Sequence, residues 1–224
     1  MLIRVRDRDR SRHFYETVLA ALERERASGD GDRWNDLIIA PASQGRPPTA
    51  GLHLAFVARS RDEVDAFWRA GTGAGFTSDG EPGPRPEYHA DYYGGFLLDP
   101  DGNSVEAVHD GKPRTGENVI DHLWIRVADL DESARFYGAI APSLGLHLRG
   151  AREERFHVAR GDRSFALVRG GVPTRHVHIA FPADGEAAVA AFHRDALAVG
   201  RRDNGFVLDP DGNSIEAVEH HYGA

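Results

Sequence analysis

The strongest constraint on the fold is a phrase that the chain contains twice. "FLLDPDGNSVEAV" occupies residues 96–108 and "FVLDPDGNSIEAV" occupies 206–218, with eleven of thirteen positions identical. Each copy reads as an apolar strand, a tight Asp-Pro-Asp-Gly turn and a returning strand, because proline presets φ and glycine accepts a positive φ. The sequence therefore predicts the same β-hairpin at two places in the chain.

Two further landmarks recur in the same order along the chain, at offsets of 122 and 125 residues. They are "IRVRDRDRSRHFY" (3–15) with "IRVADLDESARFY" (125–137), and "HLAF" (53–56) with "HIAF" (178–181). Ordered landmarks of this kind indicate a duplicated domain. We therefore expect two copies of one domain, at 1–110 and 119–224. The segment 111–118, with its glycine, proline and charges, is expected to be the linker between them.

Each copy in turn reads as two similar halves. A strand at 123–127 leads into a helix that Asp129 or Asp131 can cap, and a strand at 178–181 leads into a helix that Gly200 can end. In the first copy, Ser60 and Glu63 have the spacing of a capping box. Short β-type segments follow each helix. The pattern predicts an α+β fold with a βαβββ unit that occurs four times.

Composition excludes several classes of protein. A net charge of −8 argues against a nucleic-acid partner, which would require a basic face. No apolar run approaches the roughly 18–20 residues of a membrane span, so no membrane partner and a cytoplasmic protein are expected. The alternating Arg and Asp residues of 4–12 read as a charge-balanced, solvated segment. Because cysteine is absent, imidazole and carboxylate are the strong metal ligands that remain.

In the second copy, the first strand of each half carries a histidine, and the last strand of the copy carries a glutamate. With "DHLWIRVADLDESARFY", "HIAF" and "DPDGNSIEAV", the chain resembles the vicinal oxygen chelate superfamily over essentially its whole length. That superfamily includes glyoxalase I, extradiol dioxygenases, fosfomycin-resistance enzymes and bleomycin-binding proteins. The resemblance implies that the four βαβββ modules form two tandem half-open barrels. It also implies a divalent metal (Fe, Mn, Zn or Ni) held by first-strand histidines and a last-strand glutamate.

Carried onto this sequence, the resemblance places a metal in the second copy, on His122, His178 and Glu216. His176 precedes His178 by two residues, on what we expect to be the same strand face, and would line the site. Two imidazoles and one carboxylate leave coordination positions open for a substrate oxygen or dioxygen.

The first copy retains two of these positions, His53 and Glu106. Subtracting the offset of 122 from His122 leaves no equivalent residue in this sequence. We therefore expect the first copy to have only two of the three metal ligands.

The copies also differ in length before the glutamate, by 15 residues that correspond to "EPGPRPEYHADYYGG" (81–95). Tyrosine offers a stacking face and a hydroxyl together. We therefore expect this segment to line a substrate-binding pocket together with His53 and Glu106. Its aromatic members are Tyr88, His89, Tyr92 and Tyr93. The alternative is an ordinary surface loop that its own aromatic side chains pack.

Two functions remain open. The first is a metal-dependent dioxygenase, lyase or isomerase acting on a small oxygenated organic substrate in the second domain. Glyoxalase I itself is disfavoured, because "SFALV" (164–168) lacks the fourth carboxylate ligand of that enzyme. Phe206 stands where extradiol dioxygenases carry a tyrosine, so no catalytic residue is assigned. The second function is sequestration of a small, antibiotic-like molecule without metal or catalysis. A monomer and a homodimer are both compatible with the sequence.

Overall fold

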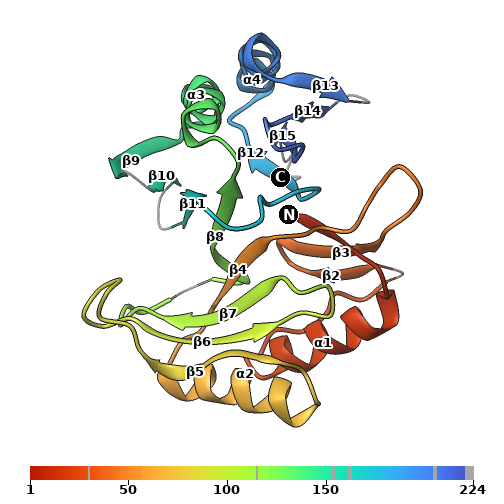
Figure 1. Cartoon of the computed structure of the whole chain (residues 1–224), viewed down its shortest axis with the longest axis vertical. Helices are drawn as coiled ribbons and strands as arrows, with labels where there is room; N and C mark the ends of the chain where they lie inside the picture. Colours follow the sequence, from red (N-terminus) through yellow and green to blue (C-terminus); the bar gives the residue numbers. More distant parts are fainter. Residues whose placement is uncertain (30, 115, 153–154, 161–162, 204–205, 220–224) are drawn as a thin grey trace. The chain divides into compact units, whose positions relative to one another are not determined.

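The computed structural model describes residues 1–29, 31–114, 116–152, 155–160, 163–203 and 206–219, and it has the expected α+β fold (Figure 1). The chain divides into two compact units. We refer to Leu2–Leu123 as the N-terminal unit and to Trp124–Ala224, with which Met1 groups, as the C-terminal unit. The division falls shortly after the predicted linker at 111–118, and the predicted domain boundaries remain a prediction.

The N-terminal unit contains two modules. In the first, β1 pairs in parallel with β3, and β3 pairs with β2. In the second, β4 pairs in parallel with β7, which continues through antiparallel pairs to β6 and β5, and α2 packs on β6 and β7. The elements are β1 (Leu2–Val5), α1 (Arg8–Ala20), β2 (Asp32–Trp34), β3 (Leu37–Pro41), β4 (Leu52–Val57), α2 (Arg61–Gly73), β5 (Ser78–Pro84), β6 (Tyr93–Leu98), β7 (Ser104–His109) and the start of β8 (Ile120–Val127).

The C-terminal unit has a similar order, with three strands after the first helix where the N-terminal unit has two among its described residues. Strands β9, β10 and β11 form an antiparallel group, and β12 pairs in parallel with β15, which is followed by β14 and β13. The elements after β8 are α3 (Leu130–Ile140), a 3-10 helix (Pro142–Leu144), β9 (His147–Arg152), β10 (Arg155–Arg160), β11 (Arg163–Arg169), β12 (His178–Pro182), α4 (Glu186–Val199), β13 (Arg201–Asp203), β14 (Phe206–Leu208) and β15 (Ser214–Val218).

The repeated phrase forms the same hairpin in both units, as expected, and each hairpin is tied to a helix. In the first, the buried Asp99 carboxylate accepts hydrogen bonds from the backbone N–H of Asn103 (2.9 Å) and from the hydroxyl of Tyr15 on α1 (2.9 Å). Asp209 and Tyr137 on α3 repeat the second contact at 2.8 Å. The aspartate therefore both closes the turn and attaches the helix to the sheet.

We expect Tyr15→Phe to destabilise the N-terminal unit by about 1.5–3 kcal/mol, because a buried carboxylate loses a hydrogen bond. Burial, and then the nearby Asp99, raise the pKa of Tyr15, so its hydroxyl stays protonated and donates. Urea unfolding of the full chain measures the loss. The matched control is Tyr93→Phe, whose hydroxyl bonds Asp65 at the partly exposed surface (2.9 Å) and should matter less. Equal losses in the two variants would contradict this role for Tyr15.

The helix starts follow the predicted caps. Ser60 Oγ accepts from the backbone N–H of Glu63 (3.2 Å), as the capping box requires. The Glu63 carboxylate returns to the backbone N–H of Arg59 (2.7 Å), one residue earlier than the simplest form of the motif. Asp129 caps α3, and α4 ends before Gly200, both as expected.

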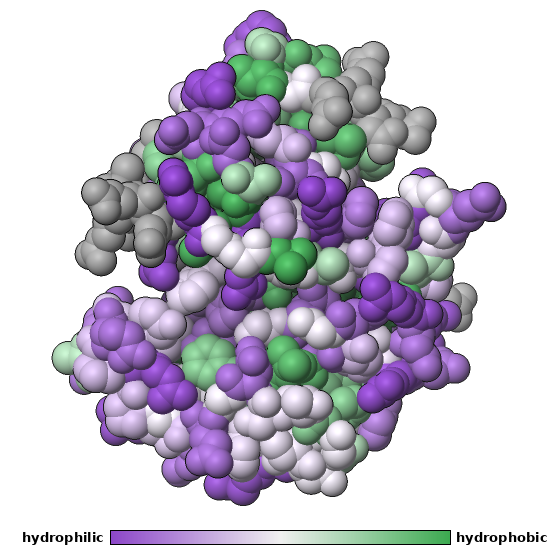
Figure 2. Space-filling model, in the orientation of Figure 1, coloured by the Kyte–Doolittle hydropathy of each residue, from purple (hydrophilic) through white to green (hydrophobic). Residues whose placement is uncertain are grey.

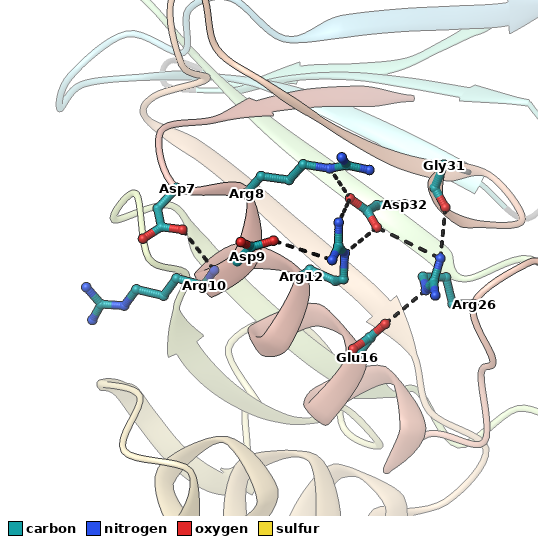
Figure 3. A network of polar contacts seen from close by, with 9 residues as sticks. All are labelled: Asp7, Arg8, Asp9, Arg10, Arg12, Glu16, Arg26, Gly31 and Asp32. Atoms are coloured by element: carbon teal, nitrogen blue, oxygen red, sulfur yellow. Dashed lines mark hydrogen bonds and ion pairs between the residues drawn. The ribbon is translucent and has the colours of Figure 1, made fainter. Parts of the chain in front are cut away.

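The Arg- and Asp-rich start of the chain is more ordered than the expected solvated segment. Arg8 and Arg12, one helical turn apart on α1, both direct Nε at the buried Asp32 of β2, at 2.7 and 2.6 Å (Figure 3). Burial opposes ionisation of Asp32. Hydrogen bonds from Arg12 and Arg8 outweigh it and hold the pKa of the carboxyl below its ordinary value. This network attaches α1 to the neighbouring sheet.

The face of the molecule in Figure 2 is mostly polar. Figure 2 shows hydrophilic residues over most of the visible face, with hydrophobic residues in separate patches between them. Among the described residues, no helix is long and apolar enough to cross a membrane.

Candidate metal centre

Three potential metal ligands meet in the N-terminal unit: His53, Glu106 and His122. One ligand atom from each lies within 4.8 Å of the others. Nε2 of His53 is 3.0 Å from Oε2 of Glu106, and Nε2 of His122 is 3.7 Å from the same oxygen. All three side chains are largely buried, and Glu106 is only 1% exposed. No other group of three such ligands occurs in the part of the chain that the structure describes.

Strand pairing brings these residues together. In the parallel pair of β4 and β7, Ala55 lies opposite Glu106 and His53 lies opposite Ser104, so His53 and Glu106 project from one face. Strand β8 begins beside β4, where the N–H of Val57 donates to the carbonyl of Val119 (2.9 Å). The His122 ring then lies 5.7 Å from the His53 ring, between centroids.

The hydrogen bond between Nδ1 of His53 and Ser104 indicates which ring nitrogen carries a proton. Nδ1 lies 3.2 Å from Oγ of Ser104, and that hydroxyl donates its proton to Asp79 (2.7 Å). Because the serine has a single proton to give, it accepts the bond from Nδ1–H of His53. A neutral His53 ring therefore presents an unprotonated Nε2 to Glu106.

His122 is arranged in the same way by different partners. Its Nδ1 lies 2.8 Å from Oδ1 of Asp121, and the other oxygen of Asp121 is 2.6 Å from Arg114. Arg114 also contacts Asp110 at 2.9 Å, so two carboxylates orient the guanidinium. A carboxylate only accepts, so Nδ1 of His122 carries a proton, and in a neutral ring Nε2 is the nitrogen with a free electron pair toward Glu106. Carboxylate partners of this kind orient metal-binding histidines in other proteins.

The second oxygen of Glu106 is held by Tyr92. The tyrosine hydroxyl donates to Oε1 at 2.7 Å, from the loop that joins β5 to β6. Burial, and then the neighbouring Glu106, raise the pKa of Tyr92 well above that of an ordinary tyrosine. The hydroxyl therefore remains a donor, and it leaves Oε2 turned toward the two histidines.

The two Nε2 atoms and Oε2 of Glu106 therefore converge, and with both rings neutral each of these three atoms offers an electron pair. Converging acceptors repel in a buried site unless a cation lies between them. Two further protons on the histidines, or one divalent ion, can supply that charge. Two imidazoles and a carboxylate, each oriented by an outer partner, are a donor set that suits Zn, Fe, Ni or Mn. The residues therefore fit a divalent metal.

The structure groups the predicted ligands differently from the repeat alignment. His122 lies with His53 and Glu106 in the N-terminal unit, whereas the repeat alignment grouped it with His178 and Glu216. His178 and Glu216 form a pair in the C-terminal unit, with Nε2 2.9 Å from Oε1. Glu216 is 27% exposed, so this second pair is more open than the first.

The aromatic segment divides between two faces. Tyr88 and His89 pack edge-on against Tyr92, with ring centroids 4.9 and 5.4 Å away, and so support the residue that holds Glu106. Tyr93 instead bonds Asp65 on α2, because successive strand residues point to opposite faces. His176 lies at a bend with φ of 64°, outside β12, so the expectation that it shares a strand face with His178 was wrong.

Sequence reasoning missed the outer partners. Ser104 had a detectable signal, because it stands two residues before Glu106 in the repeated phrase and so shares its strand face. Asp121 also had one, since it directly precedes His122. Asp79 and Arg114 had none: their positions depend on how the loops fold back.

Residues 1–107 match the model of the Glyoxalase/Bleomycin resistance protein/Dioxygenase superfamily. A glyoxalase/bleomycin resistance protein from Albidiferax ferrireducens T118 is 30% identical, over 49% of this chain and 95% of that one, with a TM-score of 0.44. Residues 1–107 therefore belong to this superfamily.

Two solved structures resemble the whole chain in fold. Glyoxalase I from Zea mays is 19% identical over 97% of this chain and 90% of that one, with a TM-score of 0.64. A Bacillus subtilis protein provisionally assigned as a dioxygenase is 13% identical over 97% and 83%, with a TM-score of 0.61. None of the curated proteins matches the sequence.

Proposed function

We propose that this chain is a metal-dependent enzyme of the vicinal oxygen chelate type. It would hold one divalent ion on His53, Glu106 and His122 and bind a small organic substrate through two neighbouring oxygens. The observation that carries the proposal is the convergence of three largely buried ligand atoms, each on a side chain that an outer partner orients. Such an arrangement is costly without a cation and well suited to one.

A bound divalent ion would act as a Lewis acid toward the substrate oxygens. The protein side chains would supply orientation. Ser104 and Asp121 hold the two imidazoles in the tautomer that presents Nε2. Tyr92 holds the carboxylate, and Tyr88 and His89 pack around Tyr92.

The donor set favours oxygenase-like chemistry over glyoxalase I chemistry. The cluster of described residues contains two imidazoles and one carboxylate, the set typical of non-heme iron oxygenases with open positions. The resemblance implies that glyoxalase I needs a further carboxylate. We therefore place dioxygenase-type or lyase-type reactions on a vicinal-oxygen substrate first.

The test is to load the full chain with Fe(II), Mn(II), Zn(II) or Ni(II), dialyse it, and measure metal per chain and catechol binding. We expect one tightly held ion per chain, and catechol binding that depends on that ion. If no metal is retained while organic ligands still bind, the chain is a sequestering protein and the proposal fails.

Gly94→Ala tests whether the position of the Glu106 carboxylate matters for metal binding. A Cβ at Gly94 would overlap Oε1 of Glu106 and lie 3.2 Å from Cε1 of Tyr92, so both side chains must shift. We expect zinc affinity to fall about 10- to 100-fold, the range for disturbed outer partners. Competition with a chromogenic chelator measures it. Gly73→Ala on α2 meets no atom within 4 Å and is the control. Unchanged affinity in Gly94→Ala would contradict the predicted crowding.

A further inference from the structure

Arg85 is a cation at the edge of the proposed metal centre with no carboxylate partner in the structure's described part. It lies at the base of the loop that carries Tyr92, where the N–H of Arg85 donates to the carbonyl of Tyr92 (2.9 Å). The same loop base therefore directs one side chain to Glu106 and a guanidinium to the Phe96 ring.

The guanidinium is fixed in place beside the site. Its carbon lies 5.4 Å from the centroid of the Phe96 ring, and that ring lies 6.2 Å from the His53 ring. Phe96 pairs directly with Glu106, so both side chains project from the same face of the sheet. One aromatic ring thus separates the cation from an imidazole of the proposed metal centre.

Backbone groups hold this position. The two terminal nitrogens of Arg85 donate to the carbonyls of Glu81 (2.8 Å) and Pro84 (3.1 Å). Glycines leave the necessary room: a Cβ at Gly83 would lie 3.0 Å from Nη1, and one at Gly80 would lie 3.0 Å from the Phe96 ring. The side chain is pre-organised without its charge being neutralised.

An ordinary surface arginine is the simpler explanation, but several arginines of the same unit have a carboxylate partner. Arg8, Arg12, Arg59 and Arg114 each pair with a carboxylate at 2.6–2.9 Å. Arg85 makes only backbone and ring contacts, which satisfy hydrogen-bonding capacity but not charge. A guanidinium recognises carboxylates through paired hydrogen bonds, so an anion is the ligand that completes it.

We propose that Arg85 is a specificity-determining residue that binds a carboxylate on the substrate. The substrate would then be an anion whose two neighbouring oxygens meet the metal while its carboxylate reaches Arg85 across Phe96. This inference rests on the proposed function, since it assumes that the substrate oxygens lie at His53, Glu106 and His122.

The experiment compares two probes on the full chain loaded with Co(II): catechol, and 3,4-dihydroxybenzoate, which adds a carboxylate. Changes in the visible cobalt spectrum report binding of each. We expect the wild type to bind 3,4-dihydroxybenzoate at least tenfold more tightly than catechol. Arg85→Gln should remove this preference without changing catechol affinity, and Arg85→Lys should retain part of it. Arg69→Gln, which alters an exposed residue of α2, should retain all of it.

The outcomes separate the two proposals. Equal affinity for the two probes in the wild type, or an undiminished preference in Arg85→Gln, overturns the role of Arg85 and leaves the metal centre standing. If neither probe changes the cobalt spectrum, or if no cobalt is retained, the proposed function falls and this inference falls with it. The wild-type comparison needs no variant to fold.

Discussion

Glu106→Gln should lower metal affinity by more than about 100-fold, beyond the range for loss of an outer partner. The substitution removes both the charge and the electron pair at Oε2 that Nε2 of His53 and Nε2 of His122 face. The amide oxygen of glutamine can still accept from Tyr92, so the fold should survive. Isothermal titration of the metal-free full chain with zinc measures the effect.

The repeat provides a matched control. Glu216 stands at the same position of the same hairpin phrase and makes the same contact to its own histidine, His178 (2.9 Å). Glu216→Gln should leave the high-affinity site intact, because that site lies in the N-terminal unit. Equal losses in the two variants, or loss only in Glu216→Gln, would transfer the metal to the C-terminal unit and reject the ligand set proposed here.

Metal binding should also stabilise the N-terminal unit strongly. An ion that binds only the folded state, at a free concentration about 1,000 times its dissociation constant, adds about 4 kcal/mol. For a unit of this size that corresponds to a rise in melting temperature of roughly 10 °C or more.

Differential scanning calorimetry of the full chain, with zinc and with excess chelator, measures this shift. The two units can unfold separately, so the transition that moves should be assigned with Tyr15→Phe, which lowers only the N-terminal transition. Glu106→Gln should show no zinc-dependent shift. A shift confined to the C-terminal transition, or one that persists in Glu106→Gln, would contradict the assignment.

Much of the fold followed from local sequence signals. The repeated phrase predicted both hairpins because turn chemistry at Asp-Pro-Asp-Gly is local. Ser60 and Gly200 marked helix ends for the same reason. These signals depend on φ, ψ and neighbouring hydrogen bonds, which a short stretch of sequence determines.

The candidate site was only half predictable. The shared phrase and "HLAF" identified His53 and Glu106 as neighbours, because β4 and β7 belong to one module. The third ligand escaped because repeat alignment equates positions between copies but does not say which strands lie side by side. His122 was aligned with the second copy, whereas β8 begins beside β4.

Strand direction explains the remaining differences. Tyr92 and Tyr93 are adjacent in sequence, yet only Tyr92 reaches Glu106, since alternate residues face opposite sides. The hairpin wording is nearly identical in the two units, but Glu106 is 1% exposed and Glu216 is 27% exposed. The loop that carries Tyr92 has no counterpart before Glu216, so identical phrases occupy different environments.

X-ray absorption at the zinc edge, on the full chain loaded with one equivalent of zinc, examines the ligand set itself. We expect nitrogen and oxygen donors at about 2.0–2.2 Å, with scattering from two imidazoles. His122→Ala should reduce this to one imidazole, whereas His178→Ala should leave the spectrum unchanged. A spectrum without imidazole scattering, or one that changes with His178 and not with His122, would show that His53, Glu106 and His122 do not form the metal centre.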